Sequence, residues 1–215
     1  KEIVKDFIKG EGYTKVYNEF IEEEKELIQL KERKDLSQEI LLKKLFNVAY
    51  KAVEASEQEV ALKYYLDSIK LAKELKNQEY QANSYGNIGV IYKIKGELDE
   101  ALKYYKQSLE ICKKIGDLAK EANQLGNIGL IYKAKGKLDE ALKYLNKSLE
   151  ISKKISYLQG EADQSVNIGN IYQNKGELDE ALKYYKHALV LDKQIGFLEG
   201  EATDLSNIGV IYQEK

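Results

Sequence analysis

The sequence predicts an all-α protein, an α-solenoid in which antiparallel helix hairpins stack in a row. Three observations lead to this prediction. The chain of 215 residues contains no proline, the residue that breaks helix interiors. It is 43% hydrophobic and 33% charged, as expected for helices with one apolar face. A segment returns every 40 residues without insertions, and a fixed period of this length indicates stacked repeats.

The repeat is clearest from residue 86 onward. The stretch GNIGVIYKIKGELDEALKYYKQSLEICKKI, residues 86–115, matches residues 126–155 at 23 of 30 positions. It returns from Val166 and begins once more at Ser206, and a divergent copy precedes it, in which Ser56 stands at the position of Gly96. We therefore predict four hairpins and half of a fifth, at residues 38–77, 78–117, 118–157, 158–197 and 198–215.

Each repeat is predicted to form two helices, because small and apolar residues recur at helical spacing in both halves. In the second repeat these residues are Tyr85, Ile88, Gly89 and Tyr92, followed by Leu98, Ala101, Leu102, Tyr105 and Leu109. Gly96 lies between the two helices, where a positive φ angle ends the first of them. Asp117 follows the second helix and is a candidate N-cap for the next repeat.

Gly86 and Gly89 lie three residues apart, as glycines do in some phosphate-binding loops. Such a loop follows a strand, whereas the segment before Gly86 continues a helical pattern. A glycine inside a helix costs about 1 kcal/mol relative to alanine, so it needs another reason to be there. We interpret Gly89 as a point of close helix approach, where a residue such as Ala101 of the facing helix packs against bare backbone. The equivalent glycines are Gly129, Gly169 and Gly209.

The first 37 residues do not follow the repeat. Their pattern predicts a short helix, a turn at Gly10–Gly12 and a longer helix that ends near Asp35. This segment is either a degenerate leading hairpin or a cap on the stack, and it could close one end of a groove.

The residues Gly89, Tyr92, Gly96, Ala101 and Tyr105 resemble the signature of the tetratricopeptide repeat. The usual unit has about 34 residues, and the longer period here is similar to that of the elongated variant in spindle-orientation adaptors and many prokaryotic multi-repeat proteins. The resemblance covers residues 38–215. It implies a right-handed superhelix whose first helices line a concave groove, where segments of other proteins bind, and it implies no catalysis.

The stripe opposite the apolar face of each first helix, which we call the first-helix face, carries almost no charge. Its candidate binding residues are Asn83, Asn87, Val90, Ile94, Asn123, Asn127, Leu130, Asn167, Asn170, Asn174 and Asn207. An asparagine side chain both donates and accepts hydrogen bonds, so it can pair with a peptide backbone. Alternatively, these asparagines bond neighbouring helices within the stack. Lys93 and Lys133 lie at the edge of this face and either favour an acidic partner or are simply solvated.

Composition argues against several other classes of function. Only one of the 34 basic residues is arginine and the net charge is −2, which argues against nucleic-acid binding. No apolar run approaches the roughly 20 residues that span a membrane. His187 is the only histidine and is expected on an outward surface, so we predict no catalytic residue, no metal site and no cofactor. The single cysteine, Cys112, fits a reducing cytoplasm.

The last helix keeps the consensus apolar positions Ile208, Ile211 and Tyr212, and no second helix follows to cover them. We expect this helix to be covered by another molecule or poorly ordered, which indicates a fragment of a longer array and would allow self-association. The leading hypothesis is a protein-interaction module that acts as an adaptor or as the sensor part of a larger protein. The alternatives are a self-assembling scaffold, or the regulatory region of an enzyme whose catalytic domain lies outside this chain.

Overall fold

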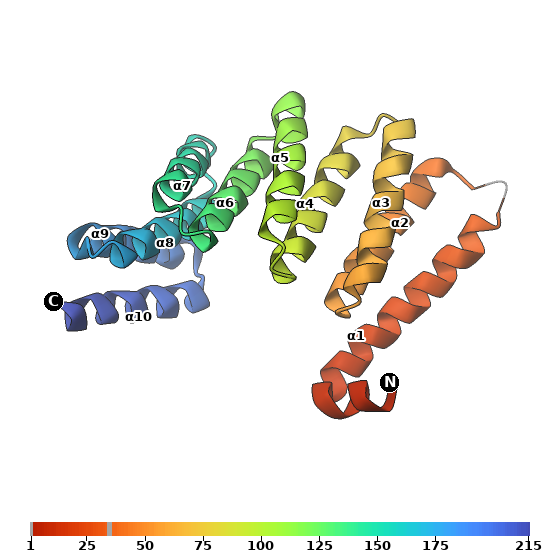
Figure 1. Cartoon of the computed structure of the whole chain (residues 1–215), viewed down its shortest axis with the longest axis horizontal. Helices are drawn as coiled ribbons and strands as arrows, with labels where there is room; N and C mark the ends of the chain where they lie inside the picture. Colours follow the sequence, from red (N-terminus) through yellow and green to blue (C-terminus); the bar gives the residue numbers. More distant parts are fainter. Residues whose placement is uncertain (1, 34–35) are drawn as a thin grey trace. The chain divides into compact units, whose positions relative to one another are not determined.

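The computed structural model describes residues 2–33 and 36–215, with side chains from Gly12 onward. All regular elements within these ranges are α-helices, which confirms the predicted fold class. Figure 1 shows their order along the chain. They are α1 (Glu2–Lys31), α2 (Gln38–Glu54), α3 (Gln58–Glu74), α4 (Gln78–Ile94), α5 (Leu98–Ile115), α6 (Leu118–Ala134), α7 (Leu138–Lys154), α8 (Leu158–Asn174), α9 (Leu178–Ile195) and α10 (Leu198–Glu214).

The chain forms two compact units, Lys1–Ile111 and Cys112–Lys215. The first unit holds α1 to α4 and most of α5, and the second holds the end of α5 and α6 to α10. Within each unit, helices that follow one another along the chain pack together, and α4 meets α5 where Gly89 lies against the ring of Tyr105. The two first helices α2 and α4 also touch, as do α6 and α8. Each unit is therefore a row of hairpins with the first helices side by side.

The hairpin turns use left-handed backbone, as the glycine positions predict. Gly96 has a φ angle of 78°, and the backbone N–H groups of Gly96 and Glu97 donate to the carbonyls of Lys93 and Tyr92. This pair of bonds satisfies carbonyl groups that the end of the helix would otherwise leave unpaired. Ser56, which replaces glycine in the divergent copy, keeps the same conformation with a φ angle of 59°.

The predicted N-cap is confirmed. Asp117 accepts a hydrogen bond from the backbone N–H of Lys120 at 3.0 Å. Although partial burial favours the neutral acid, the backbone N–H and side chain of Lys120 outweigh it and lower the pKa of the Asp117 carboxyl. Asn77 caps α4 in the same way, accepting from the N–H of Tyr80 at 3.1 Å.

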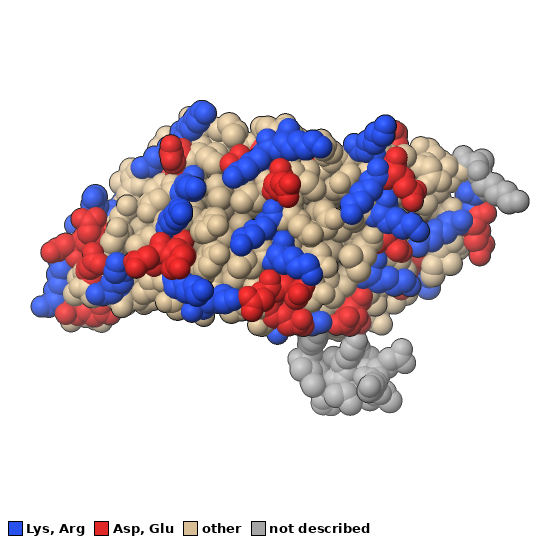
Figure 2. Space-filling model, turned by 45° about the horizontal axis from the view of Figure 1, so that its top comes forward, with Lys and Arg blue, Asp and Glu red and all other residues tan. Residues whose placement is uncertain are grey.

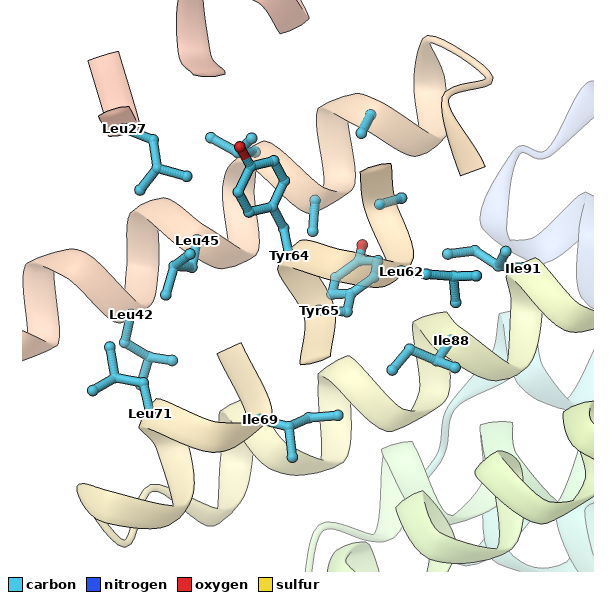
Figure 3. Close-up of a cluster of buried hydrophobic side chains, with 14 of the residues drawn as sticks. Leu27, Leu42, Leu45, Leu62, Tyr64, Tyr65, Ile69, Leu71, Ile88 and Ile91 are labelled. Atoms are coloured by element: carbon cyan, nitrogen blue, oxygen red, sulfur yellow. The ribbon is translucent and has the colours of Figure 1, made fainter. Parts of the chain in front are cut away.

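The core of the first unit forms where α2, α3 and α4 meet, and α1 adds Phe20 and Leu27 to it. Figure 3 shows Tyr65 of α3 among the aliphatic side chains of this cluster, near Ile88 and Ile91 of α4. The ring of Tyr65 is fully buried. In this unit the second helix α3 therefore packs on α4, the first helix of the next hairpin, so that neighbouring hairpins share a core.

The N-terminal prediction was wrong in one respect. Helix α1 runs without interruption from Glu2 to Lys31, so Gly10–Gly12 is helical and forms no turn. Glycine lowers helix stability but does not forbid the helical conformation, and packing of α1 against α2 supplies the missing stability. The helix ends before the expected Asp35, which lies outside the described residues.

Close helix approach is confirmed at Gly89, Gly129 and Gly169, but mainly with a partner other than the expected one, and the prediction was wrong for Gly209, where nothing lies within 4 Å of an added Cβ atom. A Cβ atom on Gly89 would lie 2.7 Å from the ring of Tyr105, and one on Gly169 would lie 2.8 Å from the ring of Tyr185. Leu145 takes this place opposite Gly129. The expected alanine position contributes only there, where the Ala141 carbonyl oxygen lies 3.2 Å from the added atom.

Alanine substitutions at two equivalent glycines are expected to have opposite effects. Gly129→Ala should lower the free energy of unfolding by about 1–2 kcal/mol, because the new methyl group overlaps Leu145 and lies in tight contact with a rigid carbonyl oxygen. Gly209→Ala should raise it by about 0.5–1 kcal/mol, because nothing lies within 4 Å and alanine favours the helix. Urea denaturation measures both changes. Equal effects at the two sites would contradict the packing role of Gly129.

Within successive hairpins, a tyrosine of the first helix stacks on a tyrosine of the second helix. Tyr92 and Tyr104 have ring centroids 5.4 Å apart at an interplanar angle of 8°. The same pair recurs as Tyr132 with Tyr144 and as Tyr172 with Tyr184. Such offset pairs contribute about 0.5–1.5 kcal/mol each beyond the area that they bury.

Ion pairs of constant spacing connect neighbouring hairpins. In the first unit Lys95 contacts Glu59 at 2.8 Å. In the second unit Lys175 contacts Asp139 at 3.5 Å, and Lys215 pairs with Asp179. Each lysine follows a first helix, and its acid lies at the start of the preceding second helix. The acid of each pair is largely exposed to solvent, so each pair contributes at most about 1 kcal/mol.

The prediction for the last helix was wrong for two of its three residues. Ile211 of α10 is fully buried and packs in one cluster with Ala181 and Tyr185 of α9, and Ile208 lies against the same cluster. Only Tyr212 is largely exposed, at 58%. The preceding second helix therefore covers one side of α10, while its outer side stays open to solvent.

Candidate functional site

The residues of the first-helix face lie on α4, α6, α8 and α10, one helix per hairpin. In the first unit, Asn83, Asn87 and Val90 are half-buried and Ile94 is 60% exposed. In the second unit, Asn127 and Leu130 of α6 and Asn167 and Asn170 of α8 are half-buried, while Asn123 and Asn174 are exposed. On α10, Asn207 is half-buried. In both units, the face is thus reachable from solvent.

Two of the asparagines bond tyrosines within the protein. Asn87 donates from Nδ2 to the hydroxyl oxygen of Tyr65 at 3.0 Å, which links α4 to the preceding hairpin. Asn170 accepts from the hydroxyl of Tyr185 at 2.8 Å, and the same hydroxyl lies 2.9 Å from Oε1 of Gln173. For these two side chains the structural interpretation holds, although each amide keeps some bonding capacity.

The other asparagines of the face make no side-chain hydrogen bond to any residue that the structure describes. Asn127 and Asn167 are the most favourably placed of them, because the helices that carry them touch. A Cβ atom on Gly126 of α6 would lie 2.9 Å from the side-chain amide of Gln164 on α8. The absence of that atom brings the two helices together beside Asn127 and Asn167.

The two lysines at the edge of the face differ. Lys93 is exposed, whereas Lys133 is half-buried and forms no ion pair with a described residue. Loss of hydration lowers the pKa of the Lys133 ammonium group. A cation in this state gains more from an added carboxylate than a fully solvated lysine does, because less water screens the pair.

The outer surface has a different character. The second helices expose lysine and glutamate, for example Lys143, Lys147 and Glu150 of α7. Figure 2 shows basic and acidic side chains interleaved across the face in view, with apolar and neutral residues between them.

Three buried or paired polar groups were not recognised from the sequence. His187 is partly exposed, as expected, but its Nε2 lies 2.7 Å from Oε1 of Glu161, a pairing that the sequence did not indicate. Asp192 of α9 and Asp204 of α10 are buried with no basic partner among the described residues. An alignment of the repeats could have identified Asp192, because the equivalent residues are Ala72, Cys112 and Ser152.

The described ranges contain no group of three or more histidine, cysteine, aspartate or glutamate side chains arranged as a metal site would need. None of the helices in residues 2–33 and 36–215 has both the length and the apolar composition that crossing a lipid bilayer requires.

Comparisons with known proteins agree with this architecture. Family models of the tetratricopeptide repeat match residues 54–114, 80–154 and 162–194, together more than half of the chain. A search of curated protein sequences finds no significant match.

Solved structures resemble the chain in fold. BtubC (BKLC) from P. vanneervenii superposes with a TM-score of 0.77 at 19% identity, over 92% of this chain and 83% of that one. A signal-transduction ATPase with a tetratricopeptide repeat sensor, from Pyrococcus horikoshii, gives 0.76 at 21% identity, over 88% and 30%. The apo form of RapI gives 0.76 at 16% identity, over 88% and 53%. The chain thus spans about a third and about half of the latter two proteins.

Proposed function

Because the chain belongs to the tetratricopeptide repeat family, we propose that its first-helix faces bind an extended or helical segment of another protein. Repeats of this family indicate a protein-interaction or scaffold module, and their fold is generally non-catalytic. The similar ATPase from Pyrococcus horikoshii carries such repeats as its sensor. This supports a role as the adaptor or sensor part of a larger protein, and the single buried cysteine supports a cytoplasmic location.

The observation that carries the proposal is that two asparagine side-chain amides, one on α6 and one on α8, have no hydrogen-bond partner among the described residues. Asn127 and Asn167 are half-buried, lie on touching helices and bond no described side chain or backbone group. Their donors and acceptors are therefore available to a peptide backbone laid across the two helices. Leu130, three residues along α6, offers apolar surface for a side chain of that peptide.

The partner segment should carry an acidic residue. Lys133 lies one turn beyond Leu130 and has no ion-pair partner of its own among the described residues. A carboxylate bound there would restore favourable interactions that the ammonium group loses through partial burial.

An unbiased peptide-display selection against the chain should enrich segments with an acidic residue, and the selected peptide then provides a binding assay. Asn127→Ala and Asn167→Ala should each weaken its affinity by about threefold to tenfold, the usual net value of one hydrogen bond. Fluorescence anisotropy measures these dissociation constants. Lys147→Ala on the outer side of α7 is the matched control and should leave the affinity unchanged.

Sedimentation velocity on the same variants tests the scaffold alternative. Leu205 and Tyr212 of α10 are 54% and 58% exposed, which makes this helix the candidate surface for self-association. An altered oligomeric state in the asparagine variants, with peptide affinity unaffected, would rule out the first-helix face as the binding site. Unchanged assembly with weakened peptide binding is the result that we expect.

A further inference from the structure

Two aspartates face each other where α10 packs on α9. Asp192 is 3% exposed and Asp204 is fully buried. As carboxylates, both oxygens of Asp204 and Oδ1 of Asp192 lack a hydrogen-bond donor among the described residues. The two groups are close enough for one to donate to the other when it is protonated. Gly200 leaves the room for this arrangement, because a Cβ atom there would overlap the Asp192 carboxylate.

The charged groups around this pair are all acidic. Burial raises the pKa of both carboxyl groups, and the negative charges of Asp163 of α8 and Glu201 of α10 raise that of Asp192 further, as Asp192 does for Asp204. Tyr185 of α9 also lies within electrostatic reach of Asp204. No lysine, arginine or histidine of the described residues offsets these negative charges at either carboxyl.

The corresponding contacts elsewhere in the chain are neutral. The positions of Asp192 and Asp204 are occupied by Ser152 and Gln164 between α7 and α8. Cys112 and Gln124 stand there between α5 and α6, and Ala72 and Ser84 between α3 and α4. The acidic pair is therefore a departure from the repeat, confined to the contact that holds α10.

We propose that Asp192 and Asp204 form a proton-dependent latch that holds α10 against α9 and that opens when the pair loses its shared proton. With one proton, the pair forms a short hydrogen bond between a carboxylic acid and a carboxylate. Without it, two buried negative charges face each other with no counter-ion, and moving α10 into solvent relieves that repulsion.

The direction of the pH dependence follows from burial. Burial, followed by the charge of Asp192, raises the pKa of Asp204 to about 7 in the docked state, whereas an exposed aspartate has a pKa of about 4. The docked state therefore binds more protons than the undocked state between these values. Docking is strongest below about pH 4, weakens by up to about tenfold per pH unit above it, and levels off once the pH passes the Asp204 pKa.

Release of α10 would also alter the first-helix face, because Asn207 lies on this helix. That consequence rests on the proposed function, whereas the latch itself does not. The experiment below measures docking alone, so its failure would leave the proposed function standing.

Hydrogen–deuterium exchange of the full chain tests the latch, with rates divided by the intrinsic rate at each pH. Between pH 5 and 7, protection of residues 198–214 should fall by up to about 100-fold, whereas that of residues 158–174 should change far less. In the Asp204→Asn variant, the protection of α10 should be the same throughout this pH range. The double variant Asp192→Ser with Asp204→Gln, which copies the α7–α8 contact, should do the same.

Glu199→Gln is the control, since Glu199 is an exposed acid on α10, and it should keep the pH dependence of the unmodified chain. All profiles are recorded in EDTA and again with calcium chloride, and the latch predicts no difference. Protection of α10 that is constant between pH 5 and 7 in the unmodified chain would overturn the proposal, as would an undiminished pH dependence in the double variant. Protection restored at pH 8 by calcium alone would replace the latch with a cation site.

Discussion

Replacing Leu145 with alanine is expected to lower the free energy of unfolding of the second unit by about 3 kcal/mol. Leu145 of α7 is fully buried and packs in one cluster with Ile168 and Ile171 of α8. It also lies directly against Gly129, which has no side chain to move into the vacated space. A cavity therefore remains in addition to the lost transfer free energy, and substitutions of this kind typically cost about 2–5 kcal/mol.

Urea denaturation followed by far-ultraviolet circular dichroism measures this loss. The same substitution at Leu205 is the matched control, because this leucine of α10 is 54% exposed, and it should cost less than about 1 kcal/mol. If both variants lost the same free energy, Leu145 would not be the link between α7 and α8 that the packing indicates.

Asn87→Ala is expected to destabilise the first unit by about 1–2 kcal/mol, although its side chain is on the candidate binding face. The substitution removes the donor that bonds the buried hydroxyl of Tyr65. Burial raises the pKa of Tyr65, so the hydroxyl stays protonated and is left without its partner. An orphaned buried polar group of this kind costs about 1–3 kcal/mol.

A double-mutant cycle with Tyr65→Phe isolates this bond. Once the hydroxyl is gone, Asn87→Ala should cost little more, which gives a coupling of about 1 kcal/mol. Asn127→Ala, which breaks no bond to a described residue, should stay within about 0.5 kcal/mol of the unmodified chain. Strictly additive losses in the cycle would show that Asn87 does not stabilise the stack through its hydrogen bond to Tyr65. If Asn87→Ala itself cost nothing, Asn87 would rank with Asn127 as a binding residue.

The regular parts of the fold could be predicted because they depend on local chemistry repeated at a fixed interval. Gly96 ends a helix because glycine readily adopts a positive φ angle. Asp117 caps the next helix through a hydrogen bond to a residue only three positions along the chain. The error at Gly10–Gly12 has the opposite origin. Whether glycine interrupts a helix depends on what the helix packs against, and that neighbour, α2, is far along the chain.

The candidate site shows the same division. Helical periodicity placed the asparagines on one stripe, but it could not distinguish Asn87 from Asn127. The two asparagines differ in whether a residue of the preceding hairpin forms a hydrogen bond with them, as Tyr65 does with Asn87. Asp192 cannot be recognised from the pattern of a single repeat, because its contact lies in the next repeat. Its significance appears only when Asp204, beyond the next turn, is seen to face it.

The ion pairs between neighbouring hairpins have an evolutionary consequence. Lys95 reaches Glu59 across the same number of residues as Lys175 reaches Asp139. Unequal recombination can therefore duplicate or delete a gene segment that encodes one repeat without loss of these contacts. The hairpins that become neighbours form the same ion pairs as before. Gains and losses of whole repeats would be tolerated far better than insertions of a few codons, so related genes are expected to differ in repeat number while repeat length stays constant.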